Sequence, residues 1–295
     1  MRRKIPGSEK GMIALCLLLI LFIAAGFPIL RSRLGRNSAP EDQSRSASGE
    51  NISDQLTDNL VFTDTSAPSA VSFSDSGQLF PDSSGRALTE EEIRSLKDIA
   101  STSWQYRILI RLAINEIYAR KGLHFNESGP FWSFYAGFDW YRESVRDGVG
   151  DGDLTGLEKD NVSLLTRIEK EEREAAQYYE DGVELIPLRG TYDQARRYAT
   201  CLGGNLVKIT DSSVQETLQG LLQRSAADFP FWTAGYCQDG RWWWDETNPV
   251  DYSAWEEAEP SVNENGARLQ VLPDGLWSAQ TDLSAPAAFL VRYSR

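Results

Sequence analysis

Acidic side chains near the carboxyl end are the first candidates for chemistry. Within the stretch DYSAWEEAEPSVNEN, from Asp251 to Asn265, three acids stand close together at Glu256, Glu257 and Glu259. Two carboxylates on either side of a glycosidic bond are the catalytic groups of most glycoside hydrolases. Clustered acids more often form a solvated surface. The sequence therefore does not predict an enzyme, and a carboxylate-dependent hydrolase is kept as an alternative.

The same stretch has the composition of a binding loop. Sugars are recognised by an aromatic face under the ring, with carboxylate and amide groups that meet the hydroxyls. Loops on a rigid scaffold commonly carry binding. The predicted ligand-binding residues are Trp255, Glu257, Glu259, Asn263 and Asn265. The alternative for Trp255 is a place in the hydrophobic core.

Few other residues are suited to catalysis or metal binding. His124 is the only histidine, so there is no second one for a catalytic triad or a zinc site. The segment from Asp147 to Glu158 is spaced like an EF-hand calcium loop, but Val149 replaces the ligand at the third position. We interpret it as a solvated turn that caps the next helix. No metal and no cofactor is predicted.

The elements around the acidic stretch indicate a compact mixed domain. FWTAGY predicts a strand, CQDG a turn, and RWWWD a second strand with Trp242 and Trp244 on the core face. Upstream, apolar residues at helical spacing predict a helix that ends at Gly203 and Gly204. A second helix is predicted from Ser212 to about Gln223.

The order of these motifs resembles the C-type lectin-like domain. The likeness rests on GGNLVKI, on FWTAG in place of the family's WIGL, and on WWW, VDYSAW, AEP, GLWS and FLVRY. It implies a lectin-like domain over residues 178–295. The family's sugar-binding members hold calcium with an EPN or QPD triplet and a WND triplet. The matching positions here are Glu259, Pro260, Ser261 and Trp277, Ser278, Ala279. Calcium needs six to eight oxygen ligands, so we expect binding without calcium.

The cysteines also depart from that family, whose members tie the first helix to the last strand with a disulfide. Cys201 lies in the first predicted helix, but the last strand has no cysteine. We expect Cys201 to be a buried free thiol, with a Cys201–Cys237 bond as the alternative. Cys16 lies in an apolar run near the amino terminus.

The amino-terminal residues 1–36 predict a short cytoplasmic tail and a membrane anchor. Residues 12–30, MIALCLLLILFIAAGFPIL, carry no charge and are long enough to cross a bilayer as one helix. A cleaved signal peptide would have a shorter apolar core and a small-residue cleavage site. Basic residues flank both ends. We expect the amino terminus inside and a single-pass protein of the cell membrane whose carboxyl-terminal domains are extracellular.

Two segments separate the anchor from the lectin-like domain. Residues 37–86 are rich in Ser, Asp, Pro, Gly and Ala and predict a disordered linker. Residues 87–177 predict a small all-α domain, with a capping box at Thr89 and Glu92 and a long helix from about Thr102 to Lys121. This segment resembles the YARHG domain of bacterial extracellular proteins through NEIYARKG, FDWY and LEKDN, with Lys121 where the family has histidine.

Fold class and charge complete the prediction. We expect an α+β protein with a transmembrane helix, a linker, an all-α domain and a lectin-like domain. The net charge is −13 although the first 36 residues are basic, and so acidic a body does not favour nucleic acid. The predicted function is a membrane-tethered ligand-binding protein of the bacterial envelope, with a glycan or an envelope protein as its partner. A cell-wall hydrolase and a structural scaffold are the alternatives.

Overall fold

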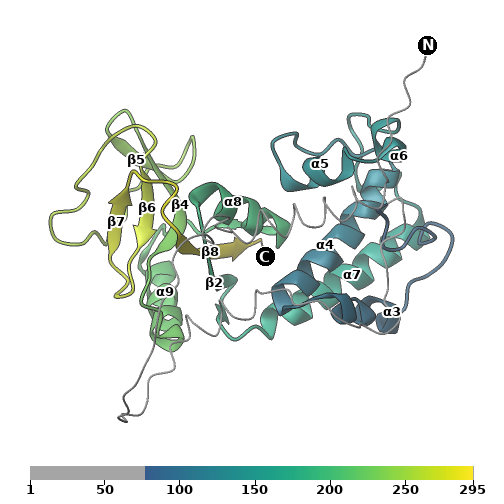
Figure 1. Ribbon diagram of the computed structural model, residues 1–295, viewed down its shortest axis with the longest axis horizontal. Helices are drawn as coiled ribbons and strands as arrows, with labels where there is room; N and C mark the ends of the chain where they lie inside the picture. Colours follow the sequence, from purple (N-terminus) through teal and green to yellow (C-terminus); the bar gives the residue numbers. More distant parts are fainter. Residues whose placement is uncertain (1–76, 295) are drawn as a thin grey trace, which may run out of the picture. The chain divides into compact units, whose positions relative to one another are not determined.

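The computed structural model describes residues 77–294, which fall in one compact unit (Figure 1). The predicted tail and anchor at 1–36 and most of the predicted linker at 37–86 lie outside the described residues. Among the residues that are described, no helix has the length and apolar character needed to cross a membrane. Leu79 and Phe80, near the end of the predicted linker, are buried, and both donate backbone N–H bonds to the carboxylate of Glu116. Ordered structure therefore begins before residue 86.

Helices make up the first part of the described chain. Their bounds are α3 Glu90–Arg94, η1 Ser95–Ile99, α4 Ser103–Arg120, α5 Pro130–Tyr135, α6 Asp139–Arg142, η2 Asp151–Asp153 and α7 Gly156–Glu174. The predicted capping box of Thr89 and Glu92 is confirmed, and a second one joins Thr155 and Glu158 at the start of α7. The long helices α4 and α7 lie side by side (Figure 1). These side-chain caps satisfy backbone N–H groups that would otherwise lack a partner at the starts of α3 and α7.

The YARKG motif at the end of α4 holds the helical part together. Tyr118 donates its hydroxyl hydrogen to Asp151 at 2.6 Å, and Arg120 forms an ion pair with Glu116. Gly122 follows with a φ of +88°, and a Cβ there would lie 2.0 Å from a backbone oxygen. Glycine is thus the residue that ends the helix without a clash. In this structure, the contacts of the motif thus serve the packing of the helical part.

The buried carboxylate of Glu158 predicts a pH-dependent stability. Burial by itself would raise its pKa, but hydrogen bonds from Lys121, the Thr155 N–H and Ser84 outweigh burial and lower the pKa to about 2. Because the folded pKa lies below the usual value, this stabilisation is present above about pH 4.5 and is lost as the pH falls toward 2. Glu158→Gln is expected to lower the free energy of unfolding by about 2–3 kcal/mol at pH 7.

Urea unfolding of wild type and Glu158→Gln between pH 2.5 and 7 measures this difference. The difference in free energy of unfolding between the two proteins should become steadily smaller as the pH falls. Glu216→Gln, at an exposed position on another helix, serves as the control and should leave stability unchanged at every pH. A gap that stays constant with pH would show that Glu158 acts through packing alone.

An eight-stranded sheet forms the second part of the described chain, which gives the whole an α+β architecture. The strand bounds are β1 Tyr179–Glu180, β2 Val183–Gly190, β3 Gly204–Leu206, β4 Phe231–Gln238, β5 Arg241–Trp243, β6 Arg268–Val271, β7 Trp277–Gln280 and β8 Ala287–Tyr293. The strand order is β1-β2-β8-β4-β6-β7, with β3 paired to β8 and β5 to β4. Most pairs are antiparallel, and β4 runs parallel to β8. Strands β4, β6 and β7 stand side by side in Figure 1.

The end of α7 corrects one prediction. The run LEKDNVSLLTRIEKEEREAAQYY predicts one helix from about Thr155 through Tyr179, whereas α7 stops at Glu174. Tyr179 and Glu180 then pair with β2 across a tight turn at Asp181 and Gly182, both with positive φ. Asp-Gly is a common sequence for such hairpin turns. The chain therefore enters the sheet at Tyr179.

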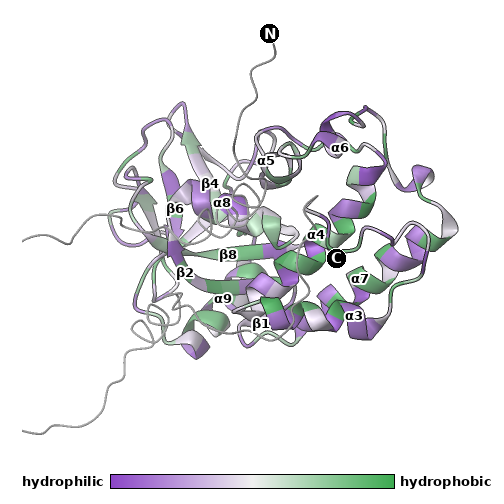
Figure 2. Ribbon diagram, turned by 45° about the vertical axis from the view of Figure 1, so that its right-hand side comes forward, coloured by the Kyte–Doolittle hydropathy of each residue, from purple (hydrophilic) through white to green (hydrophobic). Residues whose placement is uncertain are grey.

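Two helices cover the two faces of the sheet. Helix α8, Tyr192–Cys201, and helix α9, Ser212–Ser225, confirm the predicted pair, and Gly203 with a φ of +79° follows α8 as expected. Successive residues of β8 point to opposite faces, so Phe289 and Val291 join the core under α8, while Leu290 joins the core under α9. Strand β8 is mostly apolar along its length (Figure 2). A strand buried on both faces needs that composition.

The tryptophans of the β4–β5 hairpin alternate as predicted. Trp242 and Trp244 are 7% and 3% exposed and lie in the core, whereas Trp243 is only half-buried on the opposite face. Cys201 and Cys237 are both buried and free, so the prediction of a free thiol is confirmed and the alternative disulfide between them is wrong. Burial raises the pKa of Cys201 to about 12. Cys16 lies outside the described residues.

An ion pair joins the helical part to the sheet. Arg107 of α4 donates to both oxygens of Glu184 of β2 at 2.7 and 2.9 Å, and each residue is 1% exposed. Tyr293 of β8 donates its hydroxyl hydrogen to the same carboxylate at 2.5 Å. Buried residues of α4 and of β8 also belong to one apolar core, the one that lies under α8. The boundary predicted between residues 177 and 178 is therefore crossed by buried contacts, and the division into two domains stays a prediction.

Candidate functional site

The long loop between β5 and β6, residues 244–267, contains all five predicted ligand-binding residues. Backbone hydrogen bonds fasten it to the sheet at two places. Val250 N–H donates to the Trp242 carbonyl at 3.0 Å. Further on, Glu256 N–H donates to the Trp277 carbonyl at 3.0 Å, and Trp277 N–H donates to the Ala254 carbonyl at 2.9 Å. The loop is thus held against β5 and β7, which supplies the rigid support that a binding loop needs.

Trp255 packs toward the core. Its ring lies 5.1 Å from the ring of Trp242 and 5.5 Å from that of Trp277, at interplanar angles of 60° and 79°. The side chain is half-buried. Tilted and edge-to-face arrangements of this kind stabilise aromatic clusters. Trp255 therefore packs against the aromatic core and stays partly exposed, and its role in binding stays a prediction.

Glu259 uses its carboxylate to fix the loop to β7. One oxygen accepts hydrogen bonds from the N–H groups of Ser261 and Ala279, each at 2.9 Å, and the other accepts from the Ser261 hydroxyl at 2.9 Å. Burial alone would raise the pKa of Glu259, but these bonds outweigh it and lower the pKa. The Glu259–Pro260 peptide bond is cis. Three donors of the chain itself therefore meet this carboxylate.

The two predicted amides also support the loop. Asn263 accepts a hydrogen bond from the indole N–H of Trp242 at 3.0 Å, and Asn265 accepts one from the Asp239 N–H at 2.6 Å. Glu257 is exposed. Within residues 77–294, no hydrogen bond joins one of the five predicted residues to another. The structure places them on one loop but does not gather their polar groups around a common point, and their role in binding stays a prediction.

The segment with EF-hand-like spacing forms a turn before α7. Asp151 accepts from Tyr118, and Asp153 accepts from the Gly150 N–H at 3.0 Å. Thr155 caps the helix that follows. These bonds are those of a capping turn, in line with our interpretation. In the described part of the chain, no group of three or more His, Cys, Asp or Glu side chains is arranged to hold a metal ion.

His124 lies on the surface of the helical part. Its ring is 5.3 Å from that of Trp132, and Nδ1 is 3.0 Å from the carboxylate of Asp147. The hydrogen bond with Asp147 raises the pKa of His124. A carboxylate beside an exposed imidazole stabilises its charged form, and no nucleophilic side chain completes a catalytic arrangement among these contacts.

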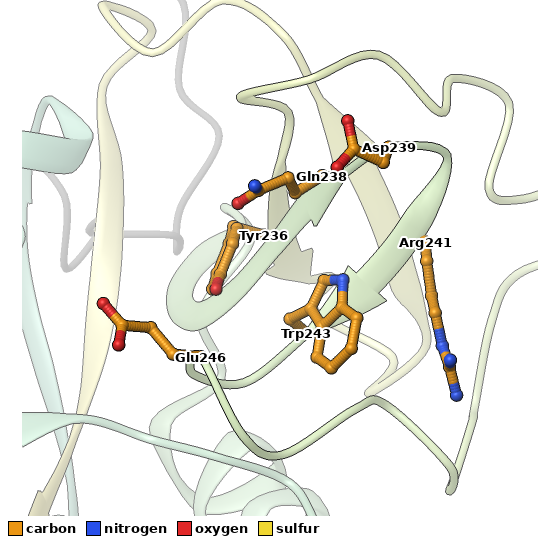
Figure 3. A pocket seen from close by; sticks show the side chains of 6 residues that line it. All are labelled: Tyr236, Gln238, Asp239, Arg241, Trp243 and Glu246. Carbon is orange, nitrogen blue, oxygen red and sulfur yellow. The ribbon is translucent and has the colours of Figure 1, made fainter.

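A hollow on the β4–β5 hairpin was missed by sequence reasoning. Its volume is about 420 Å³, and Figure 3 shows the side chains that line it. These are Tyr236, Gln238, Asp239, Arg241, Trp243 and Glu246. The alternation of RWWWD that sends Trp242 and Trp244 inward also sends Trp243 outward, and this was the signal in the sequence.

Comparisons with known proteins fit this fold. Residues 189–288 match the family model of the lectin C-type domain. No curated protein matches the chain. Human lithostathine is 18% identical over 42% of this chain and 93% of its own, with a TM-score of 0.36. Cow CD23, solved in the presence of a GlcNAc2Man3 oligosaccharide, is 24% identical over 38% of this chain and 88% of its own, with a TM-score of 0.33. The chain thus contains a C-type lectin-like domain at residues 189–288.

Proposed function

We propose that this chain is a membrane-tethered extracellular protein of a bacterial envelope. It binds a glycan or a protein through its lectin-like domain, without calcium and without catalysing a reaction. One observation carries the calcium-free and non-catalytic part of the proposal. The carboxylate of Glu259 accepts hydrogen bonds from donors of the chain itself. The lectin-like domain at residues 189–288 supplies the binding scaffold.

The residues at the family's calcium position do not fit a calcium ion. Ala279 has no side-chain oxygen, and its N–H donates to the carboxylate of Glu259 at 2.9 Å. Ser261 donates both its N–H and its hydroxyl to the same group. Calcium needs six to eight oxygen ligands with enough negative charge to replace water. Here N–H and O–H donors occupy the place of the cation, so the loop keeps its shape by hydrogen bonds.

The state of Glu259 also argues against the hydrolase alternative. A glycosidase needs one carboxylic acid with a raised pKa to protonate the leaving oxygen. The N–H donors of Ser261 and Ala279 lower the pKa of Glu259 instead. Glu256 and Glu257 are both exposed to solvent. Binding without turnover is the function that this arrangement favours.

Membrane tethering and the bacterial setting rest on the sequence. The uncharged run at residues 12–30 is the proposed anchor, with the amino terminus in the cytoplasm and the remaining domains outside. The YARHG-like pattern around Tyr118 to Gly122 supports a bacterial extracellular setting. Residues 37–76 would then separate the folded part from the membrane surface.

Chelation is expected to leave both ligand binding and thermal stability unchanged, since hydrogen bonds hold the loop. A bound ion would stabilise the folded state by mass action, and its removal would lower the melting temperature. The measurement uses the full chain in a detergent without a sugar headgroup. Binding to a glycan array and to envelope extracts is compared in excess EDTA and in excess calcium, together with thermal unfolding.

Each contrary outcome identifies a different error. A melting temperature several degrees lower in EDTA would contradict metal independence, and Asp151→Ala would then show whether the turn before α7 binds the ion. Release of soluble fragments from purified peptidoglycan would favour the hydrolase. Failure to bind any glycan or envelope protein would leave the scaffold role.

A further inference from the structure

The outward face of the β4–β5 hairpin lies opposite the part of the long loop that packs on the core at Trp255. Tyr236 and Trp243 are direct cross-strand partners, as are Cys237 and Trp242 in the next pair. Cys237 and Trp242 are buried in the core that includes Trp255 of the long loop, whereas Tyr236 and Trp243 are half-buried. Successive residues of a strand point to opposite faces. The hollow is therefore separate from the Glu259 position on the loop.

Arginine side chains hold the aromatic rings of this face in place. The Arg268 guanidinium lies 4.6 Å from the ring centre of Tyr192 and 5.4 Å from that of Tyr236. Arg241 lies 5.0 Å from the ring centre of Trp243. Stacking of this kind is favourable, and it fixes rings that would otherwise rotate on the surface. A surface ordered before binding loses less entropy when a ligand arrives.

Three polar groups beside these rings are free to meet a ligand. No hydrogen bond among the described residues uses the side chains of Gln238, Arg241 or Glu246. Figure 3 shows them around the two rings, with Glu246 on the segment that follows β5. They offer an amide, a guanidinium and a carboxylate, and so both donors and acceptors. Asp239 is already engaged with Asn265.

The lining indicates the chemical class of the ligand. A hollow of about 420 Å³ is within the range of small-molecule sites and suits one or two sugar rings. Two acids and one arginine line it, and the chain carries a net charge of −13, so a polyanionic glycan would be repelled. An apolar peptide anchor would leave the amide and carboxylate without partners, whereas the hydroxyls of a neutral pyranose can donate to the carboxylate and accept from the guanidinium.

We infer that the hollow lined by Tyr236, Trp243, Gln238, Arg241 and Glu246 binds neutral hexose or N-acetylhexosamine units of a glycan. The inference rests on the proposed function as a ligand-binding protein, and it moves the contact surface from residues 255–265 of the long loop to the outward face of the hairpin and the start of that loop at Glu246. The rings provide the apolar surface for the sugar. The three free polar groups select for hydroxyl-bearing ligands over apolar ones.

The test uses the full chain in EDTA and an array that holds neutral oligosaccharides of mannose, galactose, glucose and N-acetylglucosamine beside sulfated and uronic-acid glycans. Binding to at least one of the neutral oligosaccharides is expected. Trp243→Ala should weaken it by about tenfold or more, because a central aromatic contact is lost. Trp243→Tyr should retain most of it. Glu246→Gln and Gln238→Ala should each weaken binding severalfold.

Controls separate this inference from the proposed function. Glu216→Gln, on helix α9, matches Glu246→Gln in chemistry and should not alter binding, and thermal unfolding checks that each variant is folded. Glycan binding that is unchanged in Trp243→Ala, Glu246→Gln and Gln238→Ala would overturn the site and leave the proposed function standing. Binding only to sulfated or uronic-acid glycans, or to no glycan, would overturn the ligand class. In the latter case, capture of an envelope protein would still support the proposed function.

Discussion

Arg107→Met is expected to lower the free energy of unfolding by about 3–5 kcal/mol, because it leaves a buried carboxylate without its counterion. Arg107 donates two parallel hydrogen bonds to Glu184, at 2.7 and 2.9 Å, and both residues are 1% exposed. Without the guanidinium, the hydroxyl of Tyr293 and the indole N–H of Trp104 are the remaining donors to that carboxylate. Urea unfolding followed by circular dichroism measures the loss.

A second substitution tests the cause. Arg107→Met combined with Glu184→Gln removes the stranded charge, while the amide oxygen can still accept from Tyr293. The double variant should therefore be more stable than Arg107→Met alone. Arg94→Met is the matched control, since its partner Glu171 lies at 3.0 Å on the surface, where an ion pair contributes about 0–1 kcal/mol. If Arg94→Met and Arg107→Met lowered the free energy of unfolding equally, burial of the Arg107–Glu184 pair would not affect its contribution to stability.

The same pair bears on the division into domains. Because Arg107 belongs to α4 and Glu184 to β2, unfolding of either part exposes the charge on the other. We expect helical circular dichroism and tryptophan fluorescence to report one shared transition, and we expect Arg107→Met to shift both. Two separate transitions would favour the domain boundary predicted between residues 177 and 178.

Local signals made much of the fold predictable from the sequence. The capping box of Thr89 and Glu92, the end of α4 before Gly122 and the helix stop at Gly203 are each set by residues close in sequence. The entry of the chain into the sheet at Tyr179 was harder. The apolar spacing of α7 continues past its end, and only the Asp181–Gly182 turn marks the change to a hairpin.

The candidate site was less predictable because its polar groups have distant partners. The side chain of Asn263 is hydrogen-bonded to Trp242, and that of Glu259 to Ala279, at separations of 21 and 20 residues. Such pairs depend on how the loop folds back, which a single sequence does not state. The hollow depends on the same folding. Alternation placed Trp243 on the outer face, but its neighbour Arg268 comes from β6.

Trp277→Ala is expected to lower the free energy of unfolding by about 3–5 kcal/mol, as for other large aromatic residues removed from a core. Trp277 is 0% exposed, and the rings of Trp244, Tyr252 and Trp255 lie 5.6, 5.8 and 5.5 Å from its own. Its indole N–H donates to Gln215 at 3.0 Å. The substitution leaves a cavity and a buried amide without its donor, so the loss exceeds that of apolar contact alone.

Trp243→Ala is the matched control, because it removes the same side chain from the opposite face of the sheet. Trp243 is half-buried and stacks with Arg241, so its loss should cost about 1 kcal/mol or less. The two variants should therefore separate stability from binding: Trp277→Ala unfolds at markedly lower urea, and Trp243→Ala stays folded but loses the neutral glycan. If Trp243→Ala lowered the free energy of unfolding more than Trp277→Ala, the hairpin would be out of register by one residue. The outer hollow would then be part of the core.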